Sequence, residues 1–75
     1  MKIPTIKFTE RFNEYITHNN LTIRQVEQQT EIPNQTLSAW LSGKRIPNAY
    51  SLYVLADYMG CSVDYLLGRV DDEFR

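Results

Sequence analysis

Hydrophobic residues recur along the chain at the three- and four-residue spacing of amphipathic helices, and no segment alternates as a strand between hairpin turns does. The spacing separates five helical stretches. Their inward positions, in chain order, are Phe8, Phe12, Tyr15 and Ile16; Ile23 and Val26, with Ile32 closing the turn that follows; Leu37, Trp40 and Leu41; Leu52, Leu55, Ala56 and Met59; and Val63, Leu66 and Leu67. The pattern predicts an all-α fold, a compact bundle of five helices with short connections.

Polar and glycine residues indicate where these helices begin and end. Four side chains with a hydrogen-bonding oxygen are predicted N-caps, for the first, second, fourth and fifth helices in turn: Thr9, Thr22, Asn48 and Ser62. Gln25 lies three residues after Thr22 and completes a capping-box pattern. Pro33 suits the start of the third helix, because its missing N–H would be unpaired there anyway. The predicted ends are Asn19-Asn20 for the first helix and Gly43, Gly60 and Gly68 for the last three.

The five helices account for one domain, residues 8–68, between an N-terminal arm of residues 1–7 and an acidic, flexible tail of residues 69–75. The chain has 75 residues, of which 43% are hydrophobic, enough for one small core and too many for a disordered chain. No apolar run approaches the ~20 residues of a membrane span, and the first residues lack a secretion signal. A single cysteine cannot form an internal disulfide, so we expect a cytoplasmic protein.

The net charge of −1 argues mildly against a nucleic-acid partner, but the charges are unevenly distributed. Residues 1–31 carry as many acidic as basic side chains. Residues 32–56 carry Lys44 and Arg45 and no acid, whereas residues 57–75 carry five acids against two arginines. Because the approach of a phosphate depends on the local charge more than on the total, the segment around Lys44 and Arg45 stays a candidate DNA contact.

The third helix carries the candidate reading residues. With its apolar residues inward, its outward face consists of short uncharged side chains: Asn34, Gln35, Ser38, Ala39 and Ser42. The amides of Asn34 and Gln35 each offer a donor and an acceptor, which match N6 and N7 of adenine in the major groove of DNA. Ala39 suits contact with a thymine methyl group, and Ser38 suits a base or a phosphate. The base-contact prediction is therefore Asn34, Gln35, Ser38 and Ala39.

Backbone contacts are predicted around this face. Lys44 and Arg45 follow the third helix in a loop, where they are placed to bind phosphates and make binding sensitive to salt. Arg24, in the first turn of the second helix, and Thr36 are further candidates. Two short helices, a tight turn, a glycine stop and a basic loop are the order that a helix-turn-helix requires.

Other classes of function have less support in the sequence. No Ser/His/Asp or Cys/His arrangement, carboxylate pair or glycine-rich phosphate loop is evident, so we expect no enzyme and no cofactor. One cysteine and one histidine make a metal site unpromising, and no small-molecule ligand is indicated. The alternative is that Asn34 and Gln35 are ordinary solvent-exposed residues at the start of a helix and contact no DNA.

The chain resembles the Cro and phage-repressor (XRE) helix-turn-helix family, of the type found in Gram-positive bacteria and their phages, over about Phe8 to Gly68. The resemblance rests on Leu21-Thr22, Thr36-Leu37-Ser38, Trp40, Gly43-Lys44-Arg45, Pro47, Leu55-Ala56 and Ser62-Val63-Asp64-Tyr65-Leu66-Leu67-Gly68. It implies a lambda-repressor-like domain of five helices, with the helix-turn-helix at the second and third. It also implies a dimer on a roughly palindromic operator, with base contacts at Asn34, Gln35, Ser38 and Ala39, and backbone contacts at the start of the second helix and around Lys44-Arg45.

Three positions depart from the family pattern. Ile23 stands where a DNA-contacting Gln is frequent, and Glu27 stands where the two helices cross and a small residue is common. A buried, unpaired carboxylate would be costly, so we expect Glu27 to reach solvent or a partner such as Arg24. Glu31 replaces the glycine of the turn; a left-handed non-glycine residue costs roughly 1 kcal/mol or more, so a wider or differently shaped turn is the alternative.

A candidate dimer surface lies on the fourth helix. Tyr50, Val54 and Tyr58 repeat every four residues away from its inner face, and together with Tyr65 and Phe74 they suit an apolar contact patch. The alternative is scattered surface aromatics or additional core.

The interpretation that follows is a sequence-specific DNA-binding regulator, a phage or mobile-element type repressor that occupies its operator as a homodimer. The rival is a protein-interaction module on the same fold, such as an antitoxin or an antirepressor, with weak or no specific DNA binding. The acidity and the three departures favour the rival; the uncharged reading face and Lys44-Arg45 favour DNA.

Overall fold

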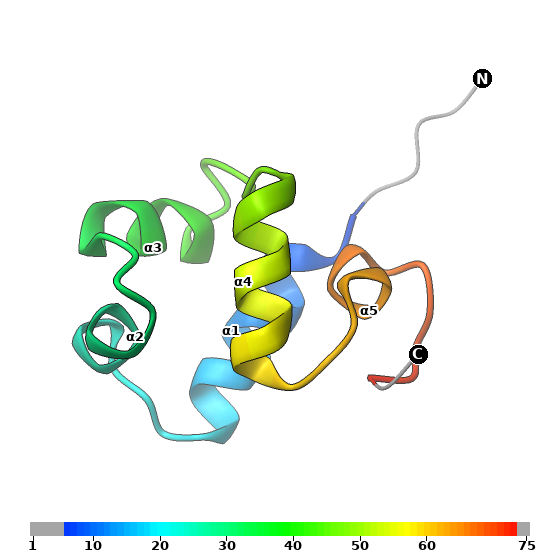
Figure 1. Cartoon of the computed structure of the whole chain (residues 1–75), viewed down its shortest axis with the longest axis horizontal. Helices are drawn as coiled ribbons and strands as arrows, with labels where there is room; N and C mark the ends of the chain where they lie inside the picture. The colour runs from blue at the N-terminus through cyan, green and yellow to red at the C-terminus, as the bar shows by residue number, and fades with distance from the viewer. Residues whose placement is uncertain (1–5, 74–75) are drawn as a thin grey trace.

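Five α-helices and their connections make up residues 6–73, the part of the chain that the computed structural model describes (Figure 1). The helices are α1 (Phe8–His18), α2 (Ile23–Thr30), α3 (Asn34–Leu41), α4 (Ala49–Met59) and α5 (Val63–Leu67). No strand occurs within residues 6–73. The predicted all-α fold of five helices is confirmed.

The helices enclose a single core rather than lying in layers. α1 packs against both α3 and α5, α4 packs against α2 and α5, and α2 packs against α3. In Figure 1 the pair α2–α3 occupies one end of the molecule and α5 the other, with α4 in front of α1 between them. The helix pair with the candidate reading residues is therefore held by α1 and α4.

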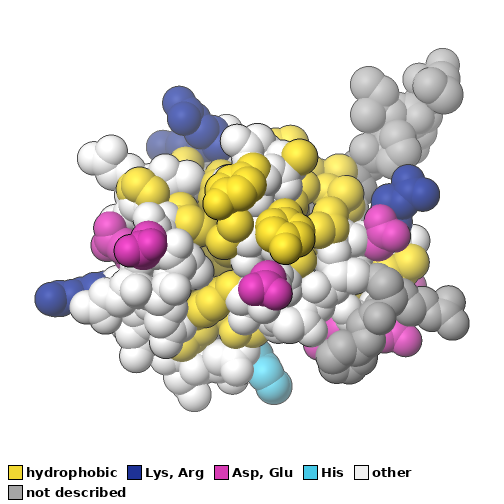
Figure 2. Space-filling view, in the orientation of Figure 1, with side chains coloured by type: hydrophobic (Ala, Val, Ile, Leu, Met, Phe, Trp, Pro, Cys, Tyr) yellow, Lys and Arg dark blue, Asp and Glu magenta, His cyan; other side chains and the backbone are white. Residues whose placement is uncertain are grey.

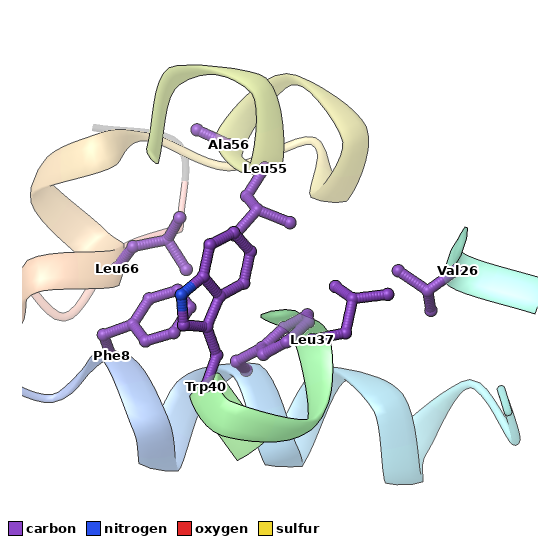
Figure 3. Close-up of a cluster of buried hydrophobic side chains, with 8 residues drawn as sticks. Phe8, Val26, Leu37, Trp40, Leu55, Ala56 and Leu66 are labelled. Carbon is purple, nitrogen blue, oxygen red and sulfur yellow. The ribbon is translucent and has the colours of Figure 1, made fainter. Parts of the chain in front are cut away.

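Trp40 lies at the centre of the core (Figure 3). Its indole ring meets Phe8 edge-on at 6.0 Å and Phe12 at 6.4 Å between ring centroids, and the two phenylalanines stack at 5.4 Å. The buried hydrophobic residues come from all five helices: Phe8, Phe12, Val26, Leu37, Trp40, Leu55, Ala56 and Leu66. All eight are among the predicted inward positions, because helical periodicity places them on one side of each helix.

Three of the four predicted N-caps are confirmed. The capping box of Thr22 and Gln25 is present, and Asn48 and Ser62 accept the expected backbone N–H groups. Gly60 and Gly68 end α4 and α5 in the left-handed conformation. α3 begins directly after Pro33 as predicted, and Gly43 (φ 80°) follows its C-cap, Ser42.

The predicted N-cap of the first helix, Thr9, is wrong. α1 begins at Phe8 with Lys7 as its N-cap residue, and no side chain caps it. Tertiary contacts set this start: Phe8 is fully buried, and the Lys7 N–H donates to the Leu67 carbonyl at 3.3 Å. The Lys7 side chain lies so close to Gly68 that a Cβ there would be 2.8 Å from Lys7 Cγ, so only glycine fits.

Arg11 is a buried arginine that fastens the C-terminal segment to the domain. Its guanidinium donates to the carbonyls of Tyr65 (2.9 Å) and Val70 (3.0 Å) and to the Asp71 carboxylate (3.1 Å). It also lies over the Tyr65 ring, 4.0 Å from the centroid. The Ser62 N–H donates to the Glu73 carbonyl at 2.8 Å. The backbone carbonyls of Val70 and Glu73 and the Asp71 carboxylate thus bond to the domain. The flexible tail over residues 69–75 stays a prediction, and residues 74–75 lie outside the described residues.

Replacing Arg11→Ala should lower the free energy of unfolding by roughly 2–3 kcal/mol, because two carbonyls and a carboxylate lose a charged donor. Asp71→Asn is the matched control: its carboxylate is 91% exposed, so at most about 1 kcal/mol should be lost. Urea denaturation followed by circular dichroism measures both. Equal losses for the two variants would contradict the role assigned to Arg11.

Candidate nucleic-acid interface

The turn between α2 and α3 is closed by local hydrogen bonds around a left-handed Glu31. Glu31 adopts φ 63° and donates its N–H to the Glu27 carbonyl at 2.8 Å. The Thr30 hydroxyl donates to the Val26 carbonyl at 2.7 Å and accepts the Ile32 N–H at 3.2 Å. The turn therefore has the left-handed residue that a glycine usually supplies, and the wider alternative is not adopted.

Glu27 caps the start of α3 from the neighbouring helix. One of its carboxylate oxygens accepts the backbone N–H of Asn34 at 3.1 Å. This partner differs from both sequence expectations, solvent and Arg24. The sequence placed Glu27 where the two helices cross, but its partner, a backbone N–H seven residues away, depends on how they pack. The sequence did contain a signal for this contact. The side chain of Pro33 cannot accept a hydrogen bond, so the first N–H groups of α3 need an acceptor from elsewhere.

The outward face of α3 forms a shallow hollow of about 390 Å³. Six residues line it: Asn34, Gln35, Ser38, Ala39, Ser42 and Lys44. The four residues of the base-contact prediction are therefore on one surface, beside one predicted phosphate contact. The Ser38 hydroxyl donates to Asn34 Oδ1 at 3.4 Å, which orients the amide at the helix start.

The end of α3 is fixed as firmly as its start. The Lys44 N–H donates to the Ala39 carbonyl (3.0 Å) and the Gly43 N–H to the Trp40 carbonyl (3.3 Å), the two bonds of a Schellman motif. The Asn13 amide reaches across from α1 to the Leu41 carbonyl at 3.0 Å. The loop with Lys44 thus leaves α3 in a defined direction, with its basic side chains exposed.

The other predicted backbone contacts lie outside the hollow. Arg24 and Arg45 are exposed, and Thr36 is half-buried. Ile23 packs against the core, which accounts for an apolar residue at that family position.

Only part of the predicted dimer surface is exposed, because some of its residues make contacts within the chain. Tyr50 is 74% exposed and Val54 is half-buried, but Tyr58 donates a hydrogen bond to the Gln29 side chain and meets the Tyr15 ring edge-on. Burial, then the neighbouring Tyr15, raises the pKa of Tyr58, so its phenol stays a donor at neutral pH. Tyr65 lies under the Arg11 guanidinium. Phe74 lies outside the described residues.

Two exposed hydrophobic residues were missed by the sequence analysis. Tyr53 is 67% exposed and Ile46 59%. Tyr53 lies three residues after Tyr50, a spacing that places both on one face of a helix. Figure 2 shows hydrophobic side chains gathered over α4, in the middle of the view. The exposed apolar surface of α4 thus consists of Tyr50, Tyr53 and part of Val54; we call it the α4 face.

The described residues contain neither a metal-binding cluster nor a membrane-spanning helix. Within residues 6–73 there is no cluster of three or more histidine, cysteine, aspartate or glutamate side chains that would hold a metal ion. None of the five helices is both long and apolar enough to cross a membrane.

Comparison with known proteins agrees with this geometry. A family model described as helix-turn-helix matches residues 13–66, which include both α2 and α3. The chain belongs to the XRE-type helix-turn-helix family. It is also 32% identical, over 62 residues, to the HTH-type transcriptional activator BcrR of Enterococcus faecalis. That match covers 83% of this chain and 30% of the relative, so the chain spans about a third of that protein's length. No solved structure matches the chain significantly.

Family membership assigns a role to each helix of the pair. In a helix-turn-helix the second helix is the one that enters the major groove, and here that helix is α3. α2 supports α3 through Val26, which is buried in the shared core, and through the Glu27 carboxylate, which caps the start of α3. Two of the three departures from the family pattern, Ile23 and Glu27, therefore have structural partners, and Glu31 alone is left with a conformational cost.

Glu31→Gly should raise the free energy of unfolding by roughly 0.5–1 kcal/mol, because glycine adopts φ 63° without a Cβ penalty. Glu31→Gln is the control: it removes the same charge but keeps the Cβ, and its stability should stay within about 0.5 kcal/mol of the parent. Urea midpoints of the three proteins give the comparison. A glycine variant no more stable than the glutamine variant would show that the turn is not strained.

Proposed function

We propose that this helix-turn-helix chain binds double-stranded DNA sequence-specifically as the DNA-binding domain of a transcriptional regulator. The observation that carries the proposal is the outward face of α3, where four uncharged side chains of the right chemistry share one shallow hollow beside Lys44.

The side chains of α3 divide into two roles. Asn34 and Gln35 read adenine through bidentate amide contacts, each worth roughly 1–3 kcal/mol of discrimination against the wrong base. Ser38 contacts a base or a phosphate, and Ala39 packs against a thymine methyl group. Both amides are exposed at the N-terminal end of the helix, the end that meets the bases in this class of proteins.

Phosphates are bound by residues around the hollow. Lys44 and Arg45 lie in the loop after α3, Arg24 in the first turn of α2, and Thr36 on α3 itself. Residues 32–56 contain no acid, but Glu27 of α2 and Glu31 of the turn add negative charge near the start of α3. The phosphate contacts position the protein and add a salt-dependent affinity that is the same for every sequence.

The proposed mode of action is occupancy of an operator by a dimer, as in phage and mobile-element repressors. Two copies joined through the α4 face would place two α3 helices on half-sites about one helical turn apart, which calls for a roughly palindromic operator. Exposed Tyr50 and Tyr53 support such a contact. Occupancy requires DNA binding alone, whereas activation, the role in the relative's name, requires a further contact with the transcription machinery.

The second candidate is a protein-interaction module on the same fold, antitoxin-like or antirepressor-like. The α4 face favours it, because aromatic residues this exposed suit a protein partner as well as a second copy. The net charge of −1 also favours it over a strong DNA binder.

Selection from randomised duplex DNA at physiological salt should enrich a palindrome with the parent chain. The double variant Asn34→Ala/Gln35→Ala should lose that enrichment while keeping residual affinity, because it removes base contacts and no charge. Lys44→Ala/Arg45→Ala is the converse control: it should weaken binding to all sequences alike and reduce the salt slope by about 2.

Either contrary outcome decides between the candidates. A folded parent chain that enriches nothing rejects specific DNA binding and favours the interaction module. Enrichment that survives the double variant rejects Asn34 and Gln35 as the reading residues.

Tyr50→Glu/Tyr53→Glu should shift the chain from dimer to monomer in sedimentation equilibrium, because two carboxylates would be buried at the contact. Thr17→Glu, on an exposed position of α1, is the control for added charge and should leave the equilibrium unchanged. An unchanged balance in the tyrosine variant, or a parent chain that is monomeric at high concentration, rejects a dimer through the α4 face.

A further inference from the structure

We propose that Glu27 is a positioning residue for DNA reading: it fixes the start of α3 and occupies the place where a phosphate would otherwise bind to that helix. The inference rests on the proposed function for its consequence on DNA, but the contact itself is present in the free chain. Glu27 is half-buried where α2 meets α3, and its carboxylate accepts the Asn34 N–H at 3.1 Å.

One residue connects both sides of the turn. The Glu27 backbone carbonyl accepts the Glu31 N–H at 2.8 Å, the bond that ends α2. Its side chain accepts the Asn34 N–H, the first free donor of α3. The end of one helix and the start of the next are thus tied to the same residue, which fixes their distance and angle. A small residue at this position would provide the first bond and not the second.

The hydrogen bond from Asn34 to Glu27 is linked to a second hydrogen bond on the outward face of α3. Asn34, whose backbone Glu27 holds, accepts the Ser38 hydroxyl on its side-chain oxygen at 3.4 Å. Both residues line the hollow. Because base contacts require side chains positioned to within about 0.5 Å, loss of the tie should reduce discrimination between sequences more than it reduces affinity.

The negative charge has a second effect. The N-terminus of a helix is a natural site for an anion, and in α3 a carboxylate already lies there. A DNA phosphate therefore gains nothing from this end of α3, and the nearby charge weakens binding to every sequence. Glu27 thus lowers non-specific affinity while it orients the specific contacts.

Two variants separate the acceptor from the charge. Glu27→Gln keeps a side-chain oxygen for the Asn34 N–H and loses the charge; Glu27→Ala loses both. We expect both variants to bind non-specific DNA more tightly than the parent chain. The ratio of specific to non-specific affinity should fall several-fold in Glu27→Ala, which loses the acceptor of the Asn34 N–H, and less in Glu27→Gln, which keeps it. A purely structural defect would instead lower both affinities in proportion.

Glu31→Gln is the matched control, since it removes an acid from the same turn without touching the start of α3. Its specificity ratio should equal that of the parent. If it changes the ratio as much as Glu27→Ala does, charge near the DNA is the cause and the positioning role is overturned.

Amide exchange in the free chain tests the contact without DNA. The Asn34 amide should exchange with solvent several-fold faster in Glu27→Ala than in the parent and at a similar rate in Glu27→Gln, because only the alanine variant leaves this N–H without its acceptor. Unchanged exchange in Glu27→Ala overturns the inference, whatever the DNA data show.

The DNA-affinity and amide-exchange measurements distinguish a failure of the proposed function from a failure of the inference about Glu27. If the parent chain selects no DNA sequence, the proposed function fails, and the reading role of Glu27 fails with it. A changed Asn34 exchange rate would then still place Glu27 as the residue that fixes α3. If the parent selects DNA and the ratio does not move in Glu27→Ala, only the inference about Glu27 is rejected.

Discussion

The burial of Trp40 against Phe8 and Phe12 is the contact on which the rest of the structure depends. The indole ring comes from α3 and inserts between the helices that flank it (Figure 3), so the inner side of α3 is determined by the core. Its outer side, with Asn34 and Gln35, faces away as a geometric consequence. Truncating a buried tryptophan costs about 3–5 kcal/mol, a large part of the stability of a small domain, so fold and reading face are lost together.

Three attachments make α3 a preorganised surface. Trp40 holds its middle, Glu27 its start, and Asn13 with the Schellman motif its end. Ordering of the helix therefore takes place during folding instead of during binding, which leaves more of the contact energy for affinity and discrimination. Of the side chains proposed to meet bases, Asn34 and Gln35 are exposed, whereas Ser38 and Ala39 are half-buried.

Charge is separated along the molecule. The basic loop after α3 belongs to a segment without acids, whereas the acidic residues 71–73 are kept beside α5 by Arg11 and by the Ser62–Glu73 bond. Figure 1 shows α5 at the end of the molecule opposite α2 and α3. The net charge of −1 therefore does not describe the surface around α3, where basic Lys44 and Arg45 follow the helix and acidic Glu27 caps its start.

The sequence alone determined the five helices, their inward faces, the capping box of Thr22 and Gln25, and the shared outer face of Asn34, Gln35, Ser38 and Ala39. These features depend on residues within one or two helical turns of each other, where spacing and capping chemistry suffice. Tertiary structure alone decided the start of α1, the partner of Glu27, the burial of Arg11, and which tyrosines of α4 stay exposed. Arg11 finds its acceptors 54 to 60 residues away, and Tyr58 finds Gln29 at a separation of 29. No periodicity encodes such pairs, because they exist only once the helices have packed against one another.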